Sequence, residues 1–335
     1  MKHPISLRAS YEEGSPQDWL NSRDDVLAVF EFGRSPLQSS DPRHVPVALQ
    51  QLGEPARLEI WRSEGPIKTG SWDCLRFAQG ELLTMGHIAL DLRTTGDMRE
   101  CSRQAYDILQ SYLRQSPHRW PLKIWNYIPG INKGEGDEEL YRQFCLGRAE
   151  AVSIDPGASP PMPAATGIGT PVDEPALQLY FLAGSLPGLD VENPRQVSAW
   201  RYPRRYGPKS PLFSRATIMR LNGSSQFLLS GTASIVGHQT HHENQAANQL
   251  SESLRNVRSL LDEGHRLMGD ARAQLDADGV LKVYVRRAED LDAVRRTLEA
   301  EVPAEVPRLY LQGDICRGNL LTEIDGIVNC RPTGS

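Results

Sequence analysis

Apolar side chains recur along this chain with two different periods. Over residues 97–114 and 244–262 they recur every three to four positions, which is the spacing of one face of an α-helix. Shorter stretches such as 56–62 alternate apolar and polar positions, as a half-buried β-strand does. The chain is therefore expected to mix helices with strands.

The elements predicted from these patterns cover most of the chain after residue 55. We expect strands at 26–32, 56–62, 72–77, 80–90, 123–127, 178–182, 214–221, 226–230, 281–286, 308–312 and 320–324. We expect helices at 97–114, 135–152, 244–262 and 290–301. Gln79-Gly80 is a plausible hairpin turn between two of the strands. Residues 1–50 are otherwise rich in polar runs, and we expect them to be irregular apart from 26–32.

The two halves of the chain repeat the same order of strands, helix, strand and helix. The first helix of each half carries a loosely similar string, QAYDIL at 104–109 and QLSESL at 249–254, which indicates a weak internal repeat. We therefore predict an α+β fold of two units, each a mixed sheet with helices packed on one face. Residues 155–175, with six prolines and three glycines, are expected to connect an N-terminal domain (1–154) to a C-terminal domain (176–335), or to form a loop that shapes a site.

Composition and charge exclude several classes of function. The chain has 335 residues, with 37 Lys and Arg against 42 Asp and Glu, so its net charge of −5 does not favour nucleic-acid binding. No apolar run approaches the ~18 residues of a membrane span, and the N-terminus lacks the apolar core of a signal peptide. Five widely spaced cysteines without a CxxC pair argue against disulfides and a zinc site. We expect a cytoplasmic protein.

One acidic residue stands in an apolar strand pattern near the C-terminus. Alternation through LLTEIDG (320–326) assigns Leu321, Glu323 and Asp325 to one face. A glutamic acid that is protonated at neutral pH needs its pKa raised from about 4.3 to above 7, and burial can raise a pKa by as much as ~3–5 units. Glu323 is therefore a candidate general acid, and a solvent-facing or salt-bridged glutamate is the alternative.

Two arginines are candidates for binding an anionic substrate. Arg148 follows FCLG and Arg215 ends the segment YGPKSPLFSR. A guanidinium can hold a carboxylate by two parallel hydrogen bonds, which an ammonium cannot do. The pair would suit a substrate with two carboxylates, whereas ordinary surface arginines are the alternative.

Other candidate sites carry weaker signals. A metal site at His238, His241 and His242 lacks an HExxH motif or an acidic ligand at a characteristic spacing, so we expect hydrogen bonding at the start of the next helix instead. Cys316 has no base placed by the sequence and is better suited to line a pocket than to act as a nucleophile. Gly-rich nucleotide loops and a GxSxG elbow do not occur.

Several longer motifs carry a resemblance to a known family. The second half, from SGTAS (230–234) through LKVYVRR (281–287) to VPRLYLQGDICRGNLLTEIDG (306–326), resembles the YjgF/RidA-like superfamily. WNYIPGINKGEG (125–136), YRQFCLGRAEA (141–151), PAATGIG (163–169), YGPKSPLFSRAT (206–217) and LLTEIDG together resemble the chorismatase family. The resemblance implies two YjgF/RidA-like units, the first of them degenerate, and a cofactor-free, metal-free enzyme that releases the enolpyruvyl group of chorismate as pyruvate.

The resemblance also assigns residues and a product. It implies that Glu323 protonates the enol-ether methylene and that Tyr141, Arg148, Tyr206 and Arg215 bind the substrate. Gly231, in SGTAS, and Cys316, seven residues before Glu323, resemble the branch that forms 3-hydroxybenzoate, sometimes with the 4-isomer.

Other functions remain possible from the sequence. A hydrolytic chorismatase would use the same residues, and a non-catalytic binder of small carboxylates or an imine deaminase would fit the superfamily. The oligomeric state is open between a monomer and a trimer.

Overall fold

The computed structural model describes residues 7–35, 40–152, 162–269 and 271–332. It begins with a four-stranded sheet in the order β1-β4-β2-β3, in which β2 and β3 are parallel. The elements of this part are β1 (Leu7–Glu12), α1 (Pro16–Ser22), β2 (Val26–Phe32), β3 (His44–Val47) and β4 (Leu58–Ser63). Residues 1–50 are therefore more regular than expected. The helix α1 was missed although Ser15 and Asp18 form a capping box at its start.

A seven-stranded sheet follows in the order β19-β9-β8-β10-β7-β6-β5. Its strands are β5 (Lys68–Trp72), β6 (Leu75–Gln79), β7 (Leu83–Asp91), β8 (Trp120–Pro129), β9 (Ala164–Thr170), β10 (Ala176–Gly184) and β19 (Asp314–Ile315). Its helices are α2 (Leu92–Thr95), α3 (Met98–Gln115), η2 (Gly136–Glu138) and α4 (Leu140–Ala151). The turn expected at Gln79-Gly80 is confirmed, and Gly80 N donates to Leu83 O.

The second seven-stranded sheet has the order β11-β12-β13-β20-β17-β18, with β16 paired to β20. Its strands are β11 (Leu189–Val191), β12 (Ala216–Leu221), β13 (Ser224–Ala233), β16 (Ala271–Ala273), β17 (Val280–Val285), β18 (Arg308–Gln312) and β20 (Thr322–Pro332). Its helices are η3 (Ala199–Arg201), η4 (Arg204–Tyr206), α5 (Ala246–Met268), η5 (Ala288–Asp290) and α6 (Leu291–Glu301). A small separate hairpin joins β14 (Ile235–Val236) to β15 (Gln239–Thr240).

The strand orders confirm the internal repeat and the α+β class. Read from one edge, β9-β8-β10-β7-β6-β5 in the first sheet corresponds to β18-β17-β20-β13-β12-β11 in the second. In both sheets the first two strands of this series are parallel. The helices α3 and α5, which carry the two similar strings, occupy equivalent places in the two units.

The predicted boundary between the units was wrong. The strand expected at 178–182 as the start of the second unit is β10, which pairs with β7 and β8 in the first sheet. Part of the proline- and glycine-rich segment 155–175 is β9, and residues 153–161 lie outside the described part. The proline-rich composition hid this strand because its prolines lie at its flanks, where no ladder hydrogen bond is lost.

Other differences are local. The strand expected at 72–77 is interrupted by a turn at Asp73, which has a φ of 54°, so its residues belong to β5 and β6. The last strand extends to Pro332, well beyond the expected end at 324. Glu323 and Asp325 lie on one face of that strand, as predicted. Leu321, which was expected on the same face, precedes the strand and packs on the other side, among the apolar residues under α5 and α6.

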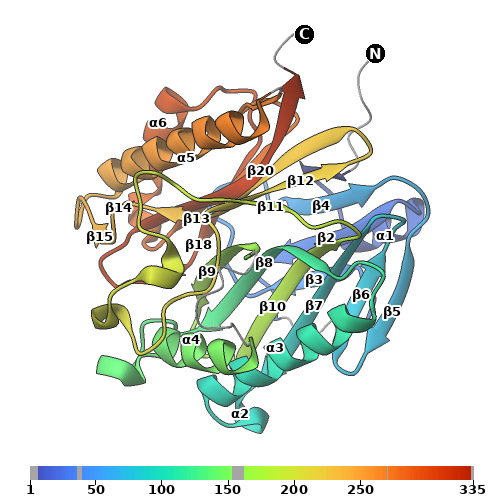
Figure 1. Cartoon of the computed structure of the whole chain (residues 1–335), viewed down its shortest axis with the longest axis horizontal. Helices are drawn as coiled ribbons and strands as arrows, with labels where there is room; N and C mark the ends of the chain where they lie inside the picture. Colours follow the sequence, from blue (N-terminus) through green and yellow to red (C-terminus); the bar gives the residue numbers. More distant parts are fainter. Residues whose placement is uncertain (1–6, 36–39, 153–161, 270, 333–335) are drawn as a thin grey trace.

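The helices lie outside and the sheets face one another inside (Figure 1). Apolar side chains of α3 and α4 pack on the first seven-stranded sheet, and those of α5 and α6 pack on the second. A central cluster joins all three sheets, and in it the ring of Trp125 packs against Trp61 and stacks on Tyr180. None of the described helices is both long and apolar enough to cross a membrane.

A close approach of α3 and α4 depends on a glycine. A Cβ atom added to Gly147 would lie 1.9 Å from the carbonyl oxygen of Arg99 on the neighbouring helix. Because that atom belongs to the backbone, the two helices would have to separate. We expect Gly147→Ala to lower the free energy of unfolding by ~1–3 kcal/mol, measured by urea denaturation. An unchanged urea midpoint would contradict this tight packing.

Candidate active site

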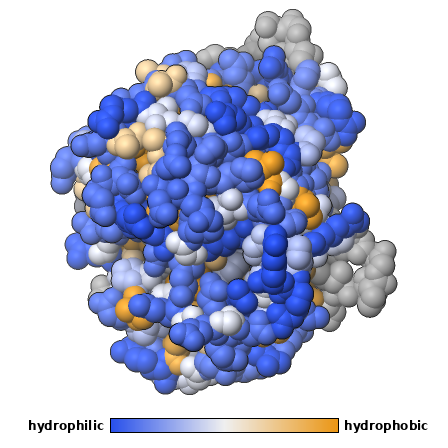
Figure 2. All heavy atoms as spheres, turned by 90° about the vertical axis from the view of Figure 1, so that its left-hand side faces the viewer, coloured by the Kyte–Doolittle hydropathy of each residue, from blue (hydrophilic) through white to orange (hydrophobic). Residues whose placement is uncertain are grey.

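A cavity of about 510 Å³ opens where the two seven-stranded units meet. Its volume lies within the range of small-molecule sites. A smaller pocket of about 40 Å³ adjoins it on the side of the first unit. The two spaces share the side chains or backbone of five residues, Tyr141, Phe213, Gly231, Cys316 and Glu323. The protein face turned toward the viewer in Figure 2 is mainly hydrophilic, with isolated apolar side chains.

The path of the chain explains why both units contribute. After β18, residues Asp314–Ile315 add a short strand beside β9 in the first sheet, and the chain then returns to the second sheet as β20. Cys316 lies on this crossing and Glu323 lies near the start of β20. The crossing brings both residues to α4 and β9 of the first unit.

Glu323 is buried, with only 4% of its surface exposed. Burial and, after it, the negative charge of Asp325 together raise the pKa of its carboxyl to about 8. Lys123 and Arg215 act in the opposite direction. Glu323 therefore holds its proton at neutral pH, which is the state that a general acid requires.

A β-bulge brings Gly231 against this carboxyl. Leu229 pairs with Gly326 and Thr232 pairs with Ile324, so Ser230 and Gly231 together oppose a single residue of β20. A Cβ atom at Gly231 would lie 1.9 Å from Oε1 of Glu323. The missing side chain therefore leaves the space that the carboxyl occupies.

The two predicted arginines lie at the two parts of the site. Arg215 lines the large cavity, where one Nη donates to Val197 O (2.7 Å) and to the Tyr202 hydroxyl (2.9 Å). Arg148, from α4, lines the small pocket and stacks over the rings of Tyr106 and Phe144. The Nε of each arginine is buried without a hydrogen-bond partner among the described residues. Each guanidinium therefore has an N–H group that no described residue uses.

The remaining predicted site residues are in the same place. Tyr141 lines both spaces, and burial raises the pKa of its hydroxyl well above the ordinary value. Tyr206 lines the large cavity, and its hydroxyl lies 3.2 Å from Nδ1 of His238. Cys316 lines both spaces, and burial followed by the charge of Glu323 raises the pKa of its thiol to about 12. A thiol that does not ionise is a wall of the site and a poor nucleophile.

Sequence reasoning missed several lining residues, and three of them contact predicted site residues or their neighbours. Tyr202 and Phe213 flank the guanidinium of Arg215, and Arg317 stacks over the ring of Tyr206 at 4.0 Å. Nη1 of Arg317 donates to His238 O (2.9 Å). Arg317 follows Cys316 directly, and that proximity was the one available signal. Tyr202 and Phe213 lie between β11 and β12, in a segment whose apolar residues show no helical or strand period.

The histidines do not form a metal cluster among the described residues, in which no three His, Cys, Asp or Glu side chains gather around one point. The expected hydrogen bonding near the helix is confirmed, because His242 O accepts from Gln249 and Nε2 of His242 lies 3.4 Å from Glu252, both on α5.

Known proteins resemble this chain over most of its length. A family model described as chorismatase FkbO/Hyg5-like, N-terminal, matches residues 59–183. A 3-hydroxybenzoate synthase of Streptomyces hygroscopicus is 36% identical over 279 residues, which cover 81% of this chain and 81% of that protein. A chorismatase of the same organism is 33% identical over 340 residues, which cover 97% and 96%.

The fold is also shared with a solved relative. A crystal structure of a chorismatase is 31% identical and covers 97% of this chain and 100% of that one, with a TM-score of 0.82. Identities above 30% extend over more than two thirds of this chain in each of these relatives. The chain belongs to the chorismatase family.

Proposed function

We propose that this protein is an enzyme that converts chorismate to pyruvate and 3-hydroxybenzoate without a cofactor. The observation that carries the proposal is the buried carboxyl of Glu323, which lines a cavity together with guanidinium groups and whose pKa is raised by that burial. The similarity to a 3-hydroxybenzoate synthase and to chorismatases supports the substrate class.

The arginines fit the charge of this substrate. Chorismate carries one carboxylate on its ring and one on its enolpyruvyl side chain. Arg215 in the large cavity and Arg148 in the small pocket offer one guanidinium at each part of the site. The hydroxyls of Tyr141 and Tyr206 add neutral hydrogen-bonding groups beside them. A dianion bound in this way would present its ether bond near Glu323.

The reaction proceeds by proton transfer to carbon. Glu323 gives its proton to the methylene carbon of the enol ether, which makes the side chain a better leaving group. The neighbouring ring hydroxyl then attacks the ether-bearing carbon, its proton is released to replace the one donated, and pyruvate departs. The resulting epoxide opens to the aromatic phenol with loss and uptake of one proton. Pyruvate and hydroxybenzoate together contain all the atoms of chorismate, so water is not consumed.

The choice of product depends on the walls of the site. Gly231 and the protonated thiol of Cys316 both adjoin Glu323, and both are small. They leave room for the ring to rearrange while the surrounding side chains exclude water. If water enters instead, the same residues release a dihydroxycyclohexadiene carboxylate.

The direct test is to incubate the purified protein with chorismate, measure pyruvate and separate the aromatic products by chromatography. We expect equal amounts of pyruvate and hydroxybenzoate, mainly the 3-isomer. A diene acid in place of the phenol would identify the hydrolytic reaction. Binding of chorismate without pyruvate release would identify a carboxylate-binding protein and overturn the proposal.

The guanidinium of Arg148 should be needed for its geometry as well as its charge. We expect Arg148→Lys to lower kcat/KM for chorismate by ~10–100-fold, because an ammonium keeps the charge but loses the two-pronged donor. Steady-state pyruvate release gives this number. Arg258→Lys, on a surface ion pair of α5, is the matched control and should change it little. Equal kinetics for Arg148→Lys and the natural chain would exclude Arg148 from substrate binding.

A further inference from the structure

A group of buried charges lies between the sheets, behind the cavity wall. Two lysines and two carboxylates form it: Lys123 on β8, Lys282 on β17, Glu59 on β4 and Asp325 on β20. All four are less than 5% exposed. Buried charges are costly unless they are paired, so a group of four in one core calls for a reason. None of the four lines the cavity.

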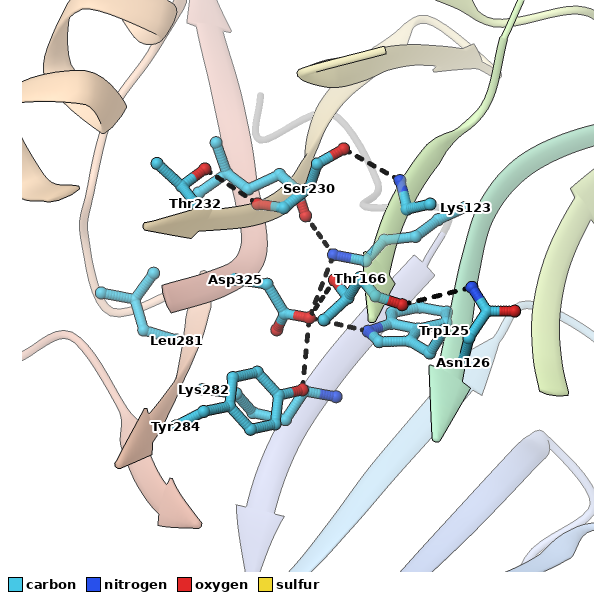
Figure 3. Close-up of polar contacts among 12 residues, drawn as sticks. Lys123, Trp125, Asn126, Thr166, Ser230, Thr232, Leu281, Lys282, Tyr284 and Asp325 are labelled. Carbon is cyan, nitrogen blue, oxygen red and sulfur yellow. Dashed lines mark hydrogen bonds and ion pairs between the residues drawn. The ribbon is translucent and has the colours of Figure 1, made fainter. Parts of the chain in front are cut away.

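Asp325 is the centre of the contacts on the side toward the active site (Figure 3). Its Oδ2 accepts from the Thr166 hydroxyl (2.7 Å), from the Trp125 indole (2.9 Å) and from the Tyr284 hydroxyl (3.3 Å). Nζ of Lys123 lies 3.5 Å from the same oxygen. Three of these four groups come from the first unit, whereas Asp325 belongs to the second.

Lys123 has a second contact that connects it to the bulge. Its Nζ also donates a hydrogen bond to the carbonyl oxygen of Leu229, the last paired residue before the bulge. The hydroxyl oxygen of Ser230, the next residue along the chain, accepts a hydrogen bond from the backbone N–H of Ala165 in β9 (2.9 Å). The first unit therefore holds the bulge at two successive residues. Gly231, the next residue, is the one that leaves room for the Glu323 carboxyl.

The ammonium group of Lys123 thus contacts both strands that position the Glu323 carboxyl. Through Leu229 it contacts β13, which carries Gly231, and through Asp325 it contacts β20, which carries Glu323 two residues earlier. We propose that Lys123 is a positioning residue that fixes the Glu323 carboxyl relative to the bulge at Gly231. This inference deepens the proposed function and rests on it for the role of Glu323.

The titratable and charged groups that face Glu323 come from several elements packed around it. They are Asp325 on its own strand, Tyr284 opposite it on β17, Lys123 on β8, Arg215 before β12, Tyr141 and Arg148 on α4, and Cys316 on the crossing segment. Asp325 raises the pKa of Glu323 and is the largest of the charged influences, whereas Lys123 lowers it. Removing the lysine should therefore raise the pKa of Glu323. Removing the lysine and the aspartate together should lower it.

The internal repeat supplies a matched control. LKIWNY at 122–127 and LKVYVR at 281–286 occupy equivalent strands, so Lys282 is the counterpart of Lys123. Lys282 is equally buried and pairs with Glu59 at 3.1 Å. Among the described residues, Lys282 makes no hydrogen bond with Leu229, Ser230 or Gly231, and its charge is not one of the main influences on the pKa of Glu323. Any general cost of losing a core lysine should appear in both variants.

The test compares Lys123→Met, Lys282→Met and the double variant Lys123→Met/Asp325→Asn. Thermal melting reports folding, pyruvate release from pH 6 to 10 gives kcat and KM, and ¹³C NMR of glutamate-labelled protein follows the Glu323 carboxyl, which is assigned with Glu323→Gln. For Lys123→Met we expect kcat to fall at least tenfold, KM to change less than threefold, and the Glu323 midpoint to move to higher pH. Lys282→Met should keep kcat within threefold and leave that midpoint unchanged.

The double variant guards against a failure of Lys123→Met to fold, because it leaves no unpaired charge in the core. We expect it to fold, to keep the low kcat, and to have a Glu323 midpoint below that of the natural chain. Natural kcat in a folded Lys123 variant, an equal loss of kcat in Lys282→Met, or failure of both Lys123 variants to fold would overturn the proposal. The NMR titration needs no substrate, so it tests the lysine even if chorismate is not converted.

Discussion

Replacing Glu323 with glutamine is expected to lower the rate of pyruvate release from chorismate by at least ~100-fold, in the range typical for loss of a general acid. Glutamine has nearly the same shape, fits the space beside Gly231 and keeps the neutral state, but it cannot donate a proton to carbon. The other two carboxylates that line the cavity, Glu139 and Glu243, are not buried. Both therefore remain in contact with solvent, whereas the Glu323 carboxyl is enclosed.

Glu301→Gln is the matched control, because it removes a carboxylate from a surface ion pair with Arg258. It should retain the natural rate. Chorismate binding by Glu323→Gln, measured by calorimetry, should stay within a few fold of the natural value. A Glu323→Gln protein with natural turnover would remove this residue from the acid role.

The same substitution should change how stability depends on pH. Below a pH of about 4.5 the Glu323 carboxyl is protonated in both the folded and the unfolded chain, so it contributes nothing. As the pH rises from there toward about 8, the Glu323 carboxyl loses its proton in the unfolded chain but keeps it in the folded chain. This ionisation favours the unfolded state, so the folded protein loses stability. The loss is of the order of a few kcal/mol and is complete above pH 8. The melting temperature of Glu323→Gln should therefore rise relative to that of the natural chain as the pH increases from 5 to 9. If the two melting temperatures change with pH in parallel, the pKa of Glu323 is not raised.

Periodicity predicted the repeated helices well because each buries one continuous stripe. The pattern at 97–114 became α3, and the one at 244–262 became most of α5. Periodicity did not predict β9, because small residues stand there in place of alternating branched and polar side chains. Gly169 is needed there because a Cβ atom would lie 2.4 Å from Ile131. Close packing between elements imposed a composition that is typical of a loop.

The candidate site could be predicted only in part from local pattern. Period-two alternation placed Glu323 and Asp325 on one face of a strand, but their burial depends on β8 and β9, which are far away in sequence. Lys123 gave no signal, since its partners at Leu229 and Asp325 are more than 100 residues distant. The family resemblance assigned the substrate-binding residues, which the fold brings together around two adjoining spaces.

The position of the site between the units follows from the repeat. By the strand pairing, Glu323 lies opposite Tyr284 in the second sheet, and Tyr180 lies opposite Trp125 at the equivalent place in the first. Tyr180 is stacked on Trp125 in the central core, and burial raises the pKa of its hydroxyl well above the ordinary value, so it is a much weaker acid than Glu323. The duplicated chain therefore carries the carboxyl in one unit and uses the other to supply Arg148, Tyr141 and the contacts that hold the bulge.

Gly231→Ala should test how closely the site is fitted around the acid. The backbone at Gly231 is not in the left-handed region, so alanine is compatible with the fold, and we expect the melting temperature to change by only a few degrees.

The added Cβ atom, however, would lie 1.9 Å from Oε1 and 2.8 Å from Cδ of Glu323, and Thr166 is only 3.3 Å away on another side. The carboxyl must therefore move, and a displacement of about 1 Å in a catalytic group can cost as much as ~100-fold in rate. We expect kcat for pyruvate release to fall at least tenfold. Natural turnover in Gly231→Ala, with Glu323 unmoved in its crystal structure, would mean that the close contact between this glycine and the carboxyl does not set the position of the acid.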